Sequence, residues 1–210
     1  MADESLSGWP VSFDGIIESV VTTEGPNGLW NVAALGLHRK DTVREGETAV
    51  ERDETAPEVR ARTWGRTRTW RNFREREMGY VQFTTDPVLF VKAALEVYEV
   101  EKAVLPEAYA WVAVKPVELE SGTKGDTPWV DWRLDPVEAE TEERAVPTFN
   151  RGYGAVVEAT VAASRLNVPS YETEQLWERI EYFESVTKRC GGERERDAFE
   201  RLLAAIEDER

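Results

Sequence analysis

Residues 13–37, FDGIIESVVTTEGPNGLWNVAALGL, contain the pattern that decides the fold class. Two apolar runs rich in β-branched residues flank Pro26 and the Asn27-Gly28 pair, and this combination is typical of a β-hairpin. We therefore predict two antiparallel strands, over residues 13–23 and 29–37, joined by a turn over residues 24–28.

The rest of the chain continues with strands and ends in helices. Hydrophobic periodicity and caps predict these elements: strands at 47–50, 59–64, 80–84, 110–119 and 129–134; helices at 67–76, from Asp86 to about Glu101, and at 150–166, 172–190 and 193–207. Asn150 and Ser170 are predicted caps, Gly191-Gly192 is a predicted stop, and residues 138–144 are a predicted acidic linker. Strands first and helices last predict an α+β fold, with a barrel domain at 1–140 and a helical region at 148–210.

The surface charge is strongly acidic. The chain has 41 acidic and 26 basic residues, a net charge of -15, and only 6 of the basic residues are Lys. Many carboxylates with little Lys keep a protein hydrated at high salt, which favours a halophilic source over an ordinary acidic protein. The same charge disfavours general nucleic-acid binding.

The sequence is typical of a cytoplasmic protein. It opens Met1-Ala2-Asp3-Glu4, without a basic stretch followed by an apolar run, and Cys190 is its one cysteine. Its apolar segments are shorter than the roughly 20 residues that cross a bilayer.

Conventional catalytic groups are sparse. His38 is the one histidine, and no metal-binding, nucleophile-elbow or phosphate-loop motif accompanies it. His38 is interpreted as a residue at a strand end, and Cys190 as a helix-end residue beside two glycines. The carboxylates are scattered, so they are interpreted as solvated surface groups.

One stretch reverses the acidic charge. Seven arginines, interleaved with tryptophan, threonine and asparagine, occur at 60, 62, 66, 68, 71, 74 and 76. If Thr67 and Thr69 begin a helix, their hydroxyls and the free N–H groups of the first turn form an anion site suited to a phosphate. The alternative is a capped helix whose arginines pair with Glu75 and Glu77 at helical spacing.

The ends of the two hairpin strands form a second candidate cluster. It consists of Thr22-Thr23 and Asn31-Val32-Ala33-Ala34, which bring hydroxyls, an amide and small residues together. A flat ring could approach there, and its polar edge could be hydrogen-bonded. Ordinary turn chemistry is the alternative explanation for Thr and Asn at a hairpin.

Four segments together resemble a known family. They are residues 18–23 with 31–36, 67–73, 84–90, and 149–152 continuing through 157–159 to 164–166. In order and spacing they resemble the archaeal DUF447 proteins, which belong to the FMN-binding split-barrel superfamily with flavin reductases and pyridoxamine-phosphate oxidases.

The resemblance implies a homodimer of six-stranded split barrels with FMN near the subunit interface. It implies the phosphate on the hydroxyl-rich helix start and the ring beside the hairpin. The implied cofactor-binding residues are Thr67, Thr69 and Asn72 for the phosphate; Thr22, Thr23, Asn31 and Ala33 for the ring; Gln82, where similar proteins carry Asn; and Asn150 and Arg151, which could also be an N-cap and a surface residue.

An FMN-dependent oxidoreductase is the function that this resemblance implies. The flavin would supply the redox chemistry, so a lack of acid–base motifs is compatible with it. The alternatives are a non-enzymatic flavin carrier or sensor, a dimeric interaction protein and, less favoured, nucleic-acid binding through the Arg/Trp stretch.

Overall fold

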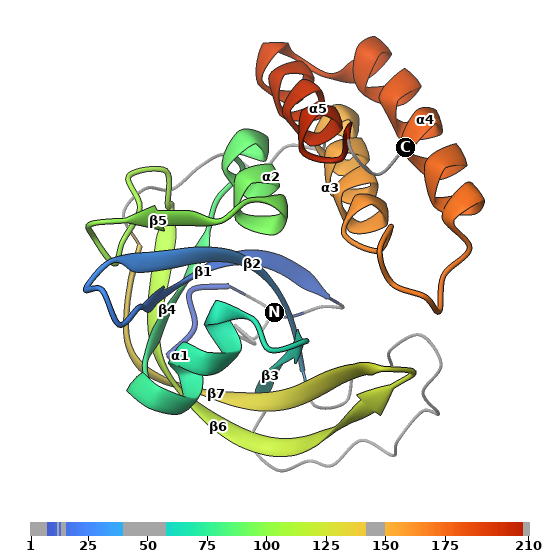
Figure 1. Ribbon diagram of the computed structural model, residues 1–210. Coiled ribbons are helices and arrows are strands. Elements are labelled where there is room, and N and C mark those ends of the chain that lie inside the picture. Colours follow the sequence, from blue (N-terminus) through green and yellow to red (C-terminus); the bar gives the residue numbers. More distant parts are fainter. Residues whose placement is uncertain (1–7, 12, 14–15, 40–57, 142–149, 208–210) are drawn as a thin grey trace. The chain divides into compact units, whose positions relative to one another are not determined.

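The computed structural model of the protein describes residues 8–11, 13, 16–39, 58–141 and 150–207. The chain divides into two compact units, Met1–Thr84 with Glu99–Arg144, and Thr85–Tyr98 with Ala145–Arg210. The first unit contains a β-barrel and one helix, and the second contains four helices (Figure 1). The helix that follows Asp86 therefore groups with the C-terminal helices.

Six antiparallel strands close into the barrel. Their order is β1-β4-β6-β7-β3-β2, and a further β1–β2 pairing closes the ring; β5 (Tyr98–Val100) follows β2 in the sheet. The six strands are β1 (Ile17–Glu24), β2 (Trp30–Arg39), β3 (Val59–Trp64), β4 (Gly79–Phe83), β6 (Ala110–Lys124) and β7 (Thr127–Thr141). The barrel and the five helices confirm the predicted α+β class.

The predicted hairpin is confirmed. Strands β1 and β2 pair so that Thr23 lies opposite Asn31, and Val21 opposite Ala33. Gly28 has a φ of 77° in the connecting turn, a conformation that glycine adopts without steric cost.

Helix α1 (Arg68–Arg76) is fixed to the barrel by its apolar side chain Phe73. The Phe73 ring is 1% exposed and lies edge-on to Trp132, with ring centroids 5.4 Å apart. Both rings belong to the barrel core, which also contains the inward-facing side chains of Val21, Val81 and Val112. Burial of Phe73 thus sets where α1 lies on the barrel.

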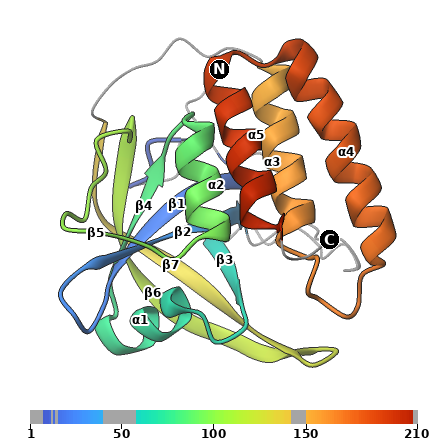
Figure 2. The ribbon, with the colours of Figure 1, turned by 45° about the horizontal axis from the view of Figure 1, so that its top comes forward.

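The second unit is a bundle of four helices with its own apolar core. It consists of α2 (Pro87–Leu95), α3 (Arg151–Ala163), α4 (Thr173–Cys190) and α5 (Glu193–Ala205), which lie side by side in Figure 2. Ion pairs join α2 to α5 at both ends of α2: Asp86 pairs with Arg194, and Glu96 pairs with Arg201.

Three boundary predictions were wrong. Helix α2 ends at Leu95, not near Glu101, because residues 98–100 form the short strand β5. Strand β7 continues to Thr141 through residues predicted as linker, since the ladder needs only backbone groups and the charged side chains of Glu138 and Glu140 are exposed. The turn between β6 and β7 is correspondingly shorter than the predicted one.

Ser170 does not cap a helix, because α4 begins after Glu172. The caps at Asn150 and Gly191 are confirmed. The predicted strand at 47–50 lies outside the described residues.

A methyl group added at Gly152 should destabilise the helical unit. An ideal Cβ there would lie 2.4 Å from the Cα atom of Gly191, which is backbone and cannot rotate away. We expect Gly152→Ala to lower the free energy of unfolding by about 1–3 kcal/mol, as overpacking does, despite the better helix propensity of alanine. Chemical denaturation measures this.

Gly154→Ala is the matched control on the same helix. No atom lies within 4 Å of its ideal Cβ, and the residue is exposed. This variant should be neutral or more stable by up to about 1 kcal/mol. Equal effects of the two substitutions would show that the close contact between Gly152 and Gly191 does not limit packing.

Candidate functional site

The N-terminus of α1 presents free hydrogen-bond donors. Thr67 is the N-cap, and its side-chain oxygen accepts a hydrogen bond from the backbone N–H of Trp70 at 3.2 Å, as predicted for a capped helix. Among the described residues, no acceptor lies on the backbone N–H groups of Arg68 and Thr69. Such unpaired N–H groups, together with the helix dipole, attract anions.

Two unpaired arginines flank this helix start. The exposed guanidiniums of Arg66 and Arg71 form no ion pair or hydrogen bond with another described residue. Arg66 directly precedes the N-cap, and side chains in a helix lean toward its N-terminus, so both add positive charge at the same end. Sequence reasoning did not separate them from the other arginines, because only the tertiary structure shows which ones have partners.

Two further arginines of α1, Arg68 and Arg74, are paired, but not as the structural alternative predicted. Arg68 pairs with Glu99 at 2.6 Å, and Arg74 lies 3.5 Å from Glu118. Glu75 and Glu77 form none of these pairs, so the prediction of ion pairs at helical spacing was wrong. The acidic partners of Arg68 and Arg74 come from strands β5 and β6 and not from α1.

A buried polar cluster joins α1 to the hairpin. Asn72 Nδ2 donates to Thr23 Oγ1 at 3.0 Å and to the Thr23 carbonyl at 3.3 Å, and Asn31 Nδ2 donates to Thr69 Oγ1 at 3.4 Å. These four side chains are at most 6% exposed. The structure therefore brings four of the predicted cofactor-binding residues together beneath the start of α1, with Thr67 capping the same helix and Ala33 on β2.

Thr22 and Gln82 lie on the outer face of the barrel, opposite to the face that carries Thr23. Side chains alternate along a strand, and Val21 and Val81 point into the barrel core, so their neighbours Thr22 and Gln82 point outward. Gln82 Nε2 donates to Thr22 Oγ1 and to the Ala103 carbonyl, both at 3.0 Å.

The Gln82 carbonyl oxygen is also used. It accepts from the Leu105 N–H at 2.7 Å. Gln82 therefore holds the segment around residues 103–105 against the outside of the barrel, and it shares no hydrogen bond with the cluster that contains Thr23.

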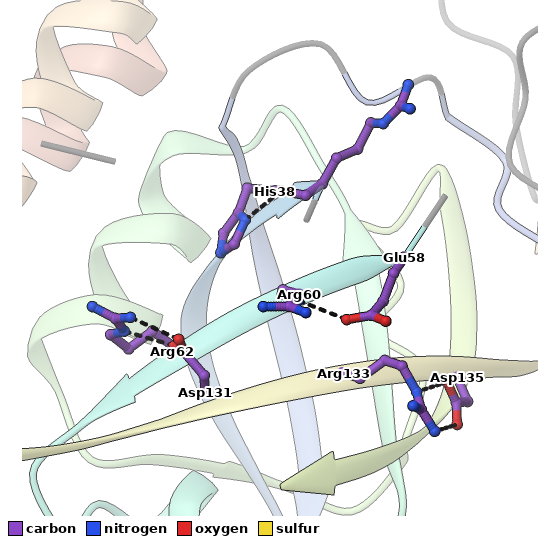
Figure 3. A network of polar contacts seen from close by, with 8 residues as sticks. His38, Glu58, Arg60, Arg62, Asp131, Arg133 and Asp135 are labelled. Atoms are coloured by element: carbon purple, nitrogen blue, oxygen red, sulfur yellow. Dashed lines mark hydrogen bonds and ion pairs between the residues drawn. The ribbon is translucent and has the colours of Figure 1, made fainter. Parts of the chain in front are cut away.

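A ladder of charged residues crosses β3 and β7 (Figure 3). Arg62 donates two hydrogen bonds of 2.6 Å to Asp131 on the facing strand, and its guanidinium lies 4.1 Å from the ring centroid of Trp129. Arg60 faces Arg133 across the same pair of strands.

Each of these two facing arginines has an acidic neighbour. Glu58 accepts from Arg60, and Asp135 accepts from Arg133. The hydrogen bond to Asp135 raises the pKa of Arg133 above its ordinary value. This ladder uses Arg60 and Arg62 of β3 structurally, so the cations without a partner near the start of α1, among the described residues, are Arg66 and Arg71.

Asn150 and Arg151 lie in the second unit, at the start of α3. Asn150 Oδ1 accepts from the N–H groups of Gly152 and Tyr153, and Asn150 Nδ2 donates to Glu195 Oε1 at 2.8 Å. Arg151 is exposed. Within the second unit, Asn150 therefore acts as the N-cap of α3.

The other two residues singled out in the sequence, His38 and Cys190, lie at or near the ends of β2 and α4. His38 is buried near the end of β2, with Nδ1 2.8 Å from the Arg39 carbonyl. Cys190 ends α4. Within the described residues, no group of three His, Cys, Asp or Glu could hold a metal ion, and no helix is long and apolar enough to cross a membrane.

Two family models match the chain along most of its length. The model "Protein of unknown function (DUF447) N-terminal domain" matches residues 17–143, and "Protein of unknown function (DUF447)" matches residues 150–204. The chain belongs to the DUF447 family. No curated protein matches it.

A solved structure of this family is similar over almost the whole chain. It is an FMN-bound protein from Methanosarcina mazei, 27% identical, with a TM-score of 0.74; the alignment covers 96% of this DUF447 protein and 100% of the other. The split-barrel fold implied by the sequence resemblance is therefore confirmed.

More distant structures were also found. A flavoredoxin from Methanosarcina acetivorans is 12% identical, with a TM-score of 0.40, over 66% of this chain and 78% of the other. Component B of nitrilotriacetate monooxygenase from Bacillus cereus is 14% identical, with a TM-score of 0.41, over 68% and 77%. At these scores neither contributes to the functional argument.

Proposed function

We propose that this DUF447 protein binds FMN, with the phosphate at the N-terminus of α1. The observation that carries the proposal is the set of donors without acceptors there: the N–H groups of Arg68 and Thr69 and the guanidiniums of Arg66 and Arg71. A phosphate monoester carries up to two negative charges and accepts several hydrogen bonds, so it fits this set. The FMN-bound relative from M. mazei supports the choice of ligand.

The hairpin is the proposed position of the flavin ring. Ala33 is only half-buried on β2 and lies on the same face of the strand as Asn31, and its small side chain is compatible with the approach of a flat ring. We assign Thr69 to the phosphate as well, because its hydroxyl oxygen accepts from Asn31 while the hydroxyl proton has no acceptor among the described residues. Thr22 and Gln82 are left out of this site, because they face the other side of β1 and β4.

The proposed activity is that of a flavin-dependent oxidoreductase. Bound FMN accepts and releases electrons at its ring, and this chain's residues hold its phosphate and orient it. We also propose a homodimer with the cofactor near the interface, as the family resemblance implies.

Removal of one unpaired charge at the helix start should weaken FMN binding selectively. We expect Arg71→Gln to raise the Kd for FMN about tenfold, the equivalent of about 1.4 kcal/mol, and to leave the Kd for riboflavin, which lacks the phosphate, unchanged. Quenching of flavin fluorescence measures both constants, with molar salt in the buffer to suit the acidic surface.

Arg76→Gln provides the control for this experiment. Arg76 is also exposed and without a partner among the described residues, but it is the last residue of α1, at the negative end of the helix dipole. The same loss of charge there should leave both constants unchanged. If wild-type protein binds neither flavin, the proposed function is wrong; if both variants weaken FMN equally, only the general charge of α1 matters.

An oxidoreductase should accept electrons on its bound flavin. We expect NADH or NADPH, added without oxygen to the FMN-loaded protein, to bleach the visible flavin absorbance faster than it bleaches free FMN. Protein-bound FMN that neither donor reduces faster than free FMN would favour the carrier or sensor.

The proposed homodimer should have about twice the 23.9 kDa mass of one chain. Sedimentation velocity in molar salt, with and without FMN, measures this mass. A species of 23.9 kDa that retains FMN would show that one chain completes the site.

A further inference from the structure

The orientation of the Asn72 side-chain amide is fixed by its surroundings. Its Nδ2 group lies 3.3 Å from the carbonyl oxygen of Thr23, and a carbonyl oxygen only accepts hydrogen bonds. A flipped amide would place two acceptors against each other, so nitrogen must face Thr23 and oxygen must face away.

The Asn72 oxygen is therefore a buried acceptor in a known direction. Asn72 is 1% exposed, and its Oδ1 atom has no hydrogen-bond partner in the part of the chain that the structure describes. Folded proteins satisfy the great majority of their buried polar atoms, and an orphaned one at a candidate site points to a group that arrives with the ligand.

A phosphate is not a suitable hydrogen-bond partner for Asn72 Oδ1. Phosphate oxygens accept hydrogen bonds, as Oδ1 does, so the two would repel each other. The family resemblance implies a phosphate role for Asn72 together with Thr67 and Thr69, but the Asn72 Nδ2 donor is already directed at Thr23. Its one free function is to accept from a hydroxyl or an N–H group of a ligand.

We infer that Asn72 Oδ1 accepts a hydrogen bond from a hydroxyl of the ribityl chain and so selects for a flavin that carries this chain. The inference rests on the proposed FMN site. Asn72 lies five residues beyond the N-cap Thr67, which corresponds to about 7.5 Å along the helix. The ribityl chain joins the phosphate to the ring, so its hydroxyls come next to a phosphate held at the helix start.

Three flavins separate the parts of the ligand. FMN has ring, ribityl chain and phosphate; riboflavin lacks the phosphate; lumiflavin lacks both the phosphate and the ribityl chain. We expect Asn72→Leu, which has a similar volume without the acceptor, to raise the Kd values for FMN and riboflavin by the same factor, about tenfold, and to leave that for lumiflavin unchanged.

Arg71→Gln is the complementary variant in the same assay. It should change the ratio of the FMN and riboflavin constants, which Asn72→Leu should not. Thr23→Val serves as a further control, because it removes one partner of Nδ2 and leaves Oδ1 in place; it should weaken the three ligands less than Asn72→Leu weakens riboflavin.

Analogues of FMN that each lack one ribityl hydroxyl test the contact on unmodified protein. One of the three should bind wild type about tenfold more weakly than FMN, and the same analogue should show no such difference with Asn72→Ala, which removes the acceptor. This arm keeps the inference testable if Asn72→Leu fails to fold.

The outcomes distinguish this inference from the proposed function. Wild-type protein that binds no flavin overturns both. Flavin binding that Asn72→Leu leaves unchanged for all three ligands overturns only the inference and indicates a buried water on Oδ1. A loss confined to FMN would make Asn72 a phosphate ligand, and an equal loss for lumiflavin would place its partner on the ring; either result overturns the ribityl assignment.

Discussion

The attachment of α1 to the end of the barrel is the constraint on which the candidate site depends. A nine-residue helix is too short to be stable alone in water, so burial must hold it. Thr69, Asn72 and Phe73 have the spacing of one helix face; Phe73 enters the barrel core, and the two polar residues meet the hairpin. Full burial of a phenylalanine side chain stabilises a fold by about 1.5–3 kcal/mol. Burial of Phe73 therefore fixes the orientation of α1 and the direction in which the free N–H groups of its first turn point.

The start of α1 keeps unneutralised positive charge in an otherwise acidic chain. The protein carries a net charge of -15, and the arginines of β3 and two of α1 are neutralised by Glu58, Asp131, Glu99 and Glu118. Arg66 and Arg71 lack such partners among the described residues. At 1 M salt the Debye length is about 3 Å, so long-range attraction is screened, and direct hydrogen bonds from backbone, hydroxyl and guanidinium groups would supply most of the selectivity of the proposed site for a phosphate.

The local elements could be predicted from the sequence because their signals are local. The strand at 59–64, the cap at Thr67 and the hairpin each depend on neighbouring residues, and the structure confirms all three. The end of β7 was missed because its exposed glutamates resemble a linker, whereas its backbone pairs with β6.

The membership of the candidate site was harder to predict than the fold. Thr22 and Thr23 are adjacent in sequence, but alternation along β1 sends them to opposite faces, where they bind Gln82 and Asn72 respectively. The availability of Arg66 and Arg71 depends on acids far away in sequence. Spacing therefore located the proposed phosphate site at the start of α1 but did not define which side chains belong to it.

The segment Asn150-Arg151-Gly152 shows why a family motif does not by itself indicate a ligand. Asn150 caps α3 and donates to Glu195, whose other oxygen accepts from the Gly192 N–H at the start of α5. Gly152 lies against Gly191, where no Cβ atom fits. The starts of two helices are thus locked together by one carboxylate and one close backbone contact, which accounts physically for Asn and Gly at these positions. Arg151 is the one residue of the three without such a structural role, and any ligand contact by this motif would have to come from its exposed guanidinium.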